Sequence, residues 1–186
     1  MENNPLREKM LPDEYVLREG KPEKGTFILR SIFNLLLPFS IVWILVDGAA
    51  IAGIFSEEGG GEYFLIPFFL LHLMPVWIYL GNLIFAVRRY KHSWWLVTNR
   101  TVYVSSGIFS MSTASKTVVA ALSVNVKRGI FEKMRGTGSI QIGSSEPLEI
   151  PAITEYETVE KLIRQYRNEN AADLFYPNEL RPKNEE

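Results

Sequence analysis

The chain has 186 residues, 20 Lys and Arg against 21 Asp and Glu, and a formal net charge of -1. With no strongly basic face and no groove-reading motif, it is not expected to bind nucleic acid. Cysteine is absent and the histidines are His72 and His92; this excludes disulfides and thiolate chemistry, and it disfavours a metal centre, so no cofactor is expected.

Two apolar stretches follow a polar N-terminal segment, residues 1–30. Residues 31–56 contain one charge, Asp47, and residues 63–87 contain none apart from a possible charge on His72. Both stretches exceed the roughly 20 helical residues that cross a hydrocarbon core. The sequence therefore predicts a transmembrane helical hairpin with spans over 31–56 and 63–87, kinked at its prolines, Pro38, Pro67 and Pro75.

Basic residues flank this hairpin on one side only. They are Lys21, Lys24 and Arg30 before the first span, and Arg88, Arg89 and Lys91 after the second, whereas the connector between the spans has none. Basic residues favour the cytoplasmic side of a membrane. Both termini are therefore predicted to be cytoplasmic, in a multi-pass protein whose first partner is the lipid bilayer.

Asp47 and His72 lie at similar depths if the two helices run antiparallel, so their side chains could meet. Ionisable groups inside a membrane often serve transport, and one interpretation is a proton or ion relay in a transporter or channel component. The other is a hydrogen bond between helices. Small residues in the first span, Gly48, Ala49, Ala52 and Gly53, predict close packing of the two helices and favour the second interpretation.

The remaining sequence changes to short β-branched and aromatic runs separated by turn residues, which is typical of strands. Strands are predicted over 93–97, 101–105, 117–121, 123–127, 139–142 and 146–150. A helix follows, with Thr154 and Glu157 as a capping box and apolar residues at helical spacing. The predicted soluble domain covers 88–168, and residues 169–186 are predicted to be a polar, mostly extended tail.

Three segments of this half together resemble a known family: WWLVTNRTVYVSSGIFS, VVAALSVNVKRGIFEKMRGTGSIQI and PAITEYETVEKLIRQY. They resemble the bacterial pleckstrin-homology-like domain of small prokaryotic membrane proteins. The residues that carry the resemblance are Thr98, Asn99, Arg100, Gly107, Val124, Val126, Gly136, Gly138 and Ile140, with Leu11, Pro12, Asp13 and Glu14 matching an N-terminal "LPxE" segment.

The resemblance implies an α+β protein in which a transmembrane hairpin precedes a PH-like, curled antiparallel β-barrel capped by a C-terminal helix. It also implies a prokaryotic inner membrane as the location. It implies no defined reaction, since a fold alone does not specify a function.

No catalytic motif stands out, and the sequence is not expected to encode an enzyme. The best candidate surface is basic: Arg88, Arg89, Lys91, Lys127, Arg128, Lys133 and Arg135. Such residues can attract an anionic leaflet, although they also fit a solvated loop and ordinary topology signals. The expected function is association with a membrane protein partner, with another copy of the chain, or with anionic lipid of the inner leaflet.

Overall fold

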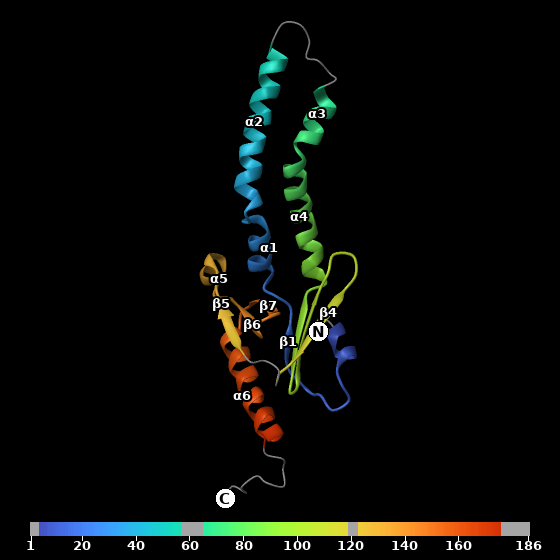
Figure 1. Cartoon of the computed structure of the whole chain (residues 1–186), viewed down its shortest axis with the longest axis vertical. Helices are drawn as coiled ribbons and strands as arrows, with labels where there is room; N and C mark the ends of the chain where they lie inside the picture. The colour runs from blue at the N-terminus through green and yellow to red at the C-terminus, as the bar shows by residue number, and fades with distance from the viewer. Residues whose placement is uncertain (1–3, 57–64, 119–122, 176–186) are drawn as a thin grey trace, which may run out of the picture. The chain divides into compact units, whose positions relative to one another are not determined.

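The computed structural model describes residues 4–56, 65–118 and 123–175, and the chain divides into two compact units (Figure 1). The β-rich unit comprises Met1–Phe27 and Arg88–Glu186, and the apolar unit comprises Ile28–Val87. Of the predicted N-terminal segment, residues 4–27 belong to the β-rich unit and residues 28–30 to the apolar unit.

Two antiparallel sheets form the β-rich unit. The first has the order β1 (Val16–Gly20), β2 (Trp94–Thr98), β3 (Thr101–Ser106) and β4 (Ser112–Thr117), and the second has the order β5 (Val124–Lys127), β6 (Gly138–Ile142) and β7 (Leu148–Ile153). Short helix α5 (Ile130–Arg135) joins β5 to β6, and α6 (Tyr156–Phe175) follows β7. Within the described ranges both sheets are open, so the predicted closed barrel is wrong.

One apolar core unites the two sheets and α6. It contains Trp95, Val97, Val102, Val118, Val124, Ile140, Ile142, Ile150, Ile153, Val159 and Ile163. Val159 and Ile163 are four residues apart, so they share one face of α6 and cover the sheets with it. The amphipathic C-terminal helix predicted from the sequence is confirmed.

The other face of the first sheet is covered by the N-terminal 3₁₀ helix η1 (Pro5–Lys9). Leu6 of this helix is fully buried with Leu96 and Tyr103 in a second, smaller cluster. Asn4 donates from Nδ2 to the Trp95 carbonyl at 3.2 Å. Strand β2 is therefore buried on both faces, which explains the continuous burial of Leu96 and Val97.

Four predicted strands are confirmed as β2, β3, β5 and β6. Of the strand predicted over 117–121, Thr117 ends the edge strand β4, a polar run over Ser112–Thr117, Val118 lies outside any strand, and residues 119–121 lie outside the described chain. β7 extends to Ile153, three residues beyond its predicted end. Helix α6 continues to Phe175, so the predicted start of the extended tail at residue 169 is also wrong.

The apolar unit is helical. It contains part of α1 (Lys24–Ile32), all of α2 (Leu36–Ser56) and α3 (Leu65–His72), and most of α4 (Met74–Lys91). By length and composition, one helix could cross a membrane, over Leu36–Ile54; α3 and α4 pass the same test as a pair, bent by 52°. The described helices thus provide one candidate span, or two if the bent pair is a single span.

The bend between α3 and α4 has a local cause at Pro75. Proline has no N–H to donate, and its ring clashes with the carbonyl four residues earlier, so a helix breaks there. The chain restarts as Val76 N and Trp77 N both donate to the Leu73 carbonyl. The start of α2 is fixed by a side-chain cap instead, since Asn34 Oδ1 accepts from Leu36 N at 2.8 Å.

The small residues of α2 do not pack as predicted. A Cβ atom added at Gly48 or Gly53 would meet no atom within 4 Å, and Ala49 and Ala52 are also exposed. Within the described residues, the prediction that this stripe lies against the second helix is therefore wrong.

Candidate functional site

Helix α5 exposes two large apolar side chains because a buried carboxylate fixes its orientation. Glu132 is 3% exposed, accepts from Gly129 N at 2.6 Å and accepts from Ser139 Oγ. With Glu132 turned inward, Ile130 and Met134, four residues apart, are exposed to 75% and 78%. Gly136 ends the helix in the left-handed conformation, with a φ of 66°.

Basic residues surround α5. Lys127 ends β5 and Lys133 lies on α5, and both side chains are exposed. Arg128 donates from Nε to the Thr137 carbonyl at 3.0 Å, and its guanidinium lies over the Tyr156 ring at 4.9 Å. These contacts hold the Arg128 stem while its charge stays at the surface.

Arg135 is paired with Glu23, a residue that sequence analysis did not single out. Its Nε and Nη2 atoms each donate to the Glu23 carboxylate at 3.0 Å. Glu23 also accepts from Thr26 N at 2.6 Å and from Gly25 N at 3.0 Å, capping the start of α1. The Arg135 guanidinium, followed by these further hydrogen bonds, lowers the pKa of Glu23 from 4.5 to about 2 despite partial burial.

This cluster fixes α5 beside the first connection between the units. Thr26 Oγ1 lies 3.2 Å from Thr137 Oγ1, one residue before Gly138 begins β6. A Cβ atom at Gly25 would lie 2.5 Å from Arg135 Cζ, so a larger residue there would displace the guanidinium from its present position. Phe27 is the last residue before the apolar unit.

The other three predicted basic residues, Arg88, Arg89 and Lys91, lie in the last turn of α4, at the second connection. The Arg88 guanidinium is 5.7 Å from the ring centroid of Phe109, which belongs to the β3–β4 loop and is 75% exposed. Ser93 Oγ donates to the Arg89 carbonyl at 2.7 Å and ends the helix immediately before β2. The seven predicted basic residues therefore form two groups, on the β5–α5 segment and at the end of α4.

Asp47 and His72 are brought together in the apolar unit, as their predicted depths had indicated. His72 Nδ1 lies 2.9 Å from Asp47 Oδ1, and the Asp47 side chain is only 3% exposed. The His72 ring lies between the rings of Trp43 and Phe68, at centroid distances of 5.1 and 5.3 Å. Trp43 Nε1 also donates to the His72 carbonyl at 2.7 Å. The pair is thus held in a fixed aromatic setting.

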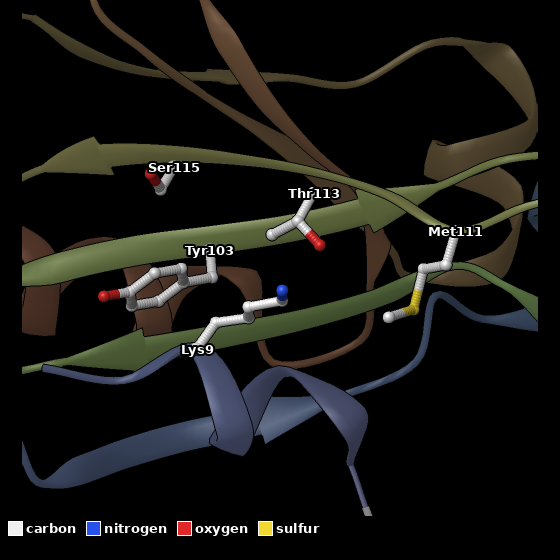
Figure 2. A pocket seen from close by; sticks show the side chains of 5 residues that line it. All are labelled: Lys9, Tyr103, Met111, Thr113 and Ser115. Carbon is white, nitrogen blue, oxygen red and sulfur yellow. The ribbon is translucent and has the colours of Figure 1, made fainter.

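A groove of about 490 Å³ lies on the first sheet, lined by Lys9, Tyr103, Met111, Thr113 and Ser115. Figure 2 shows the Lys9 side chain extending from the N-terminal helix along the strands that carry Tyr103 and Thr113. The lining contains no His, Cys, Asp or Glu side chain. In the parts of the chain that the structure describes, no group of three His, Cys, Asp or Glu side chains could hold a metal ion.

Beside this groove, Glu14 of the "LPxE" segment has a structural role. Its Oε2 accepts from Tyr103 Oη at 2.8 Å and from Leu11 N at 3.1 Å. Burial raises the pKa of Glu14, but hydrogen bonds led by Thr101 outweigh burial and give a net lowering. Burial, together with the Glu14 carboxylate, raises the pKa of Tyr103. The motif therefore fastens the N-terminal segment onto β3.

The Thr98–Arg100 turn is also explained by its contacts. Thr98 Oγ1 accepts from Thr101 N at 2.9 Å and closes the β2–β3 hairpin. Asn99 exchanges two hydrogen bonds with the Tyr15 backbone, and its carbonyl accepts from Asn170 Nδ2 at 2.8 Å. One turn thus ties together the start of β1, the hairpin and α6.

Two small antiparallel sheets around one core, followed by a packed C-terminal helix, define the PH-like class of domain. Comparison with protein families shows that the Bacterial PH domain family matches residues 33–170. The match covers most of the chain, and the chain belongs to this family, as the sequence resemblance had indicated. Neither the curated proteins nor the solved structures that were compared gave a significant match.

Sequence analysis missed four residues of the connection regions: Glu23, Phe109, Ile130 and Met134. It predicted no helix between the strands over 123–127 and 139–142, because α5 has only six residues and no extended periodicity. The signal for Glu23 was its position one residue before α1, where a carboxylate oxygen can accept from the first free N–H groups of a helix.

Proposed function

We propose that this protein is a non-enzymatic, membrane-anchored module whose Bacterial PH domain is held at the inner surface of a prokaryotic cell membrane. There it associates with a membrane protein partner, with another copy of the chain, or with anionic lipid. The hairpin over 31–56 and 63–87 is the anchor, in a multi-pass arrangement with both termini cytoplasmic.

The observation that carries this proposal is the exposure of apolar side chains around α2. Leu45 is 66% exposed, and Phe39, Ile41, Val42 and Val46 are also exposed on neighbouring positions around the helix. A soluble helix buries its apolar residues on one face, whereas a helix in lipid is apolar all round. Hydrocarbon is the environment that removes this much apolar surface from water.

The orientation is supported by the basic residues at the end of α4. Arg88, Arg89 and Lys91 follow the apolar unit directly, and positive charge beside a span favours the cytoplasm. The association role is supported by the lack of a convergent chemical site in the described groove around Tyr103.

Topology can be tested with single cysteines, because the natural chain has none. In inside-out vesicles, Arg100→Cys should react with a water-soluble maleimide, and in intact cells it should not. Leu45→Cys should stay unreactive in both until detergent is added. Rapid labelling of Leu45→Cys in both preparations would refute the membrane anchor, and labelling of Arg100→Cys from outside the cell would refute the orientation.

Association is tested on the full chain in lipid nanodiscs and in native membranes. Crosslinked dimers, a captured membrane protein, or a preference for anionic lipid would each support the proposal. A monomer with no partner and no lipid preference would contradict it.

The alternative function is a small transporter or channel component that uses Asp47 and His72. The observation that favours it is the 2.9 Å contact of a buried carboxylate with an imidazole in the apolar unit. In that case Asp47→Asn should abolish an ion flux across proteoliposomes while leaving the circular dichroism spectrum unchanged. Asn keeps a hydrogen-bond acceptor for His72, so the substitution removes the charge and leaves the hydrogen bond. An unchanged flux would therefore contradict this alternative.

A further inference from the structure

Three side chains of the β-rich unit are unusually exposed for their type. Among its described residues, Phe109, Ile130 and Met134 are the most exposed large apolar side chains, at 75%, 75% and 78%. They come from two segments far apart in sequence, the β3–β4 loop and α5. Single exposed apolar side chains are common on soluble domains, so the positions of these three decide what they mean.

Both segments lie beside the connections to the apolar unit. Helix α5 is fastened to the start of α1 through Arg135 and Glu23, at the first connection. Phe109 lies against Arg88, the first residue after the apolar unit, at the second connection. These contacts are all internal to the β-rich unit. They place its exposed apolar side chains at the points where the chain leaves it.

The charges at the same places are mainly positive. Lys127, Arg128 and Lys133 accompany α5, and Lys91 accompanies Arg88. Arg135 is neutralised by Glu23, so it adds little net charge. Apolar side chains flanked by cations fit the boundary between headgroups and acyl chains of an anionic leaflet. A protein partner would more often present a continuous apolar area with a polar rim.

We propose that α5 and the β3–β4 loop form an interfacial anchor, defined by Phe109, Ile130 and Met134, that seats the Bacterial PH domain on the anionic leaflet. This inference rests on the proposed membrane anchorage. The apolar side chains enter the headgroup boundary, while the surrounding lysines and arginines bind lipid phosphate. The domain is then held by three attachments, its two chain connections and this anchor.

The test uses the full chain in nanodiscs with an environment-sensitive fluorophore on single cysteines. Met134→Cys and Phe109→Cys report on the anchor. Arg100→Cys is the water-exposed control, because the β2–β3 turn lies at the opposite end of β2 from the α4 connection. Leu45→Cys reports on the apolar unit. Quenching by an aqueous quencher should be about fivefold weaker at Met134 and Phe109 than at Arg100 in anionic nanodiscs.

Charge dependence provides the second measurement. The protection at Met134 should fall by at least half when anionic lipid is replaced by zwitterionic lipid, or when Lys127→Glu and Lys133→Glu are combined. Lys161→Glu, on the exposed side of α6, is the matched control and should have no effect. Added salt should weaken the protection in the same way, since exposed charges are screened.

The outcomes separate the inference from the proposal beneath it. If the Leu45 label is also quenched as strongly as the Arg100 label, membrane anchorage itself fails. If Leu45 is protected but Met134 and Phe109 are quenched like Arg100, only the interfacial anchor is refuted. Protection of Met134 in native membranes but not in pure lipid nanodiscs would assign this surface to a protein and would also overturn the inference.

Discussion

The ion pair between Glu23 and Arg135 makes the stability of the β-rich unit depend on pH. Glu23→Gln removes the negative charge but keeps an oxygen that can cap α1. The lowered pKa, from 4.5 to about 2, would correspond to about 3.4 kcal/mol if it acted wholly on folding. Arg135 is 45% exposed, and solvent screens exposed pairs, so we expect about 1–1.5 kcal/mol.

The sign of the pH dependence follows from the direction of the shift. Glu23 has a lower pKa in the folded state than in the unfolded state. Its contribution is therefore fully present above about pH 4.5 and is lost as the pH falls towards about 2. The difference between the natural chain and Glu23→Gln should follow the same course.

Unfolding can be followed in the β-rich unit alone. Trp94 and Trp95 belong to that unit. Replacing Trp43 and Trp77 by Phe therefore leaves these two as the tryptophans that report on unfolding. In detergent at pH 7, Glu23→Gln should lower the Tm by about 4–6 °C. At pH 2.5 the difference should shrink to less than half.

Glu146→Gln is the control for this measurement, since Glu146 lies in the exposed loop between β6 and β7. It should leave the Tm within 1–2 °C of the natural value, in the range of ordinary surface substitutions of about 0.5 kcal/mol. A Tm difference for Glu23→Gln that is the same at pH 7 and pH 2.5 would show that the charge plays no part. No difference at either pH would show that the ion pair contributes nothing.

Two further substitutions test the packing of the same unit. Gly138→Ala would place a Cβ atom 2.7 Å from Cγ of Tyr156 and should lower the free energy of unfolding in urea by about 1–3 kcal/mol. In the control, Gly129→Ala, the new Cβ atom meets no atom closer than 3.4 Å, so the loss should be less than half as large. Equal losses would contradict the packing of β6 on α6. Tyr103→Phe removes the hydrogen-bond donor to buried Glu14 and should lower the free energy of unfolding by about 1–2 kcal/mol near pH 7. This loss should decrease as the pH falls below 4.5, because the pKa of Glu14 is lowered in the folded state. A loss that does not depend on pH would exclude this hydrogen bond as the cause.

Strands with a clear alternation of apolar residues were predictable. Val124 and Val126, or Ile140 and Ile142, belong to the confirmed strands β5 and β6. The edge strand β4 was not predictable in this way, because its sequence STASKT is polar and the strand is held by backbone pairing with β3. Backbone hydrogen bonds are open to any residue except proline, so a polar edge leaves no pattern in the sequence.

The N-terminal elements were missed for a related reason. β1 has the sequence VLREG, and the charged residues Arg18 and Glu19 make it untypical of a strand. It exists because Trp95, Leu96 and Val97 of β2 offer a free edge to pair with. Pairing partners far along the chain cannot be read from local composition. The closed barrel was wrongly predicted for the same reason, because closure depends on which distant strands pair.

The candidate sites show the same division between local and distant information. The contact of Asp47 with His72 followed from helix length and direction alone. The pairing of Arg135 with Glu23 joins residues 112 apart in the chain, and no local pattern indicated it. Predicted lists of basic residues therefore say where charge lies, and only the fold says which charges are already neutralised.

The first sheet is built from both sides of the apolar unit, and this has a consequence for how the protein folds. Tyr15 and Asn99, which fix the outer strand, are 84 residues apart in sequence. Contacts of such long range are formed slowly, because a large loop must close first. During synthesis, η1 and β1 leave the ribosome well before β2 exists. They remain unpaired until α2, α3 and α4 have been made. Completion of the β-rich unit is therefore timed by completion of the apolar unit.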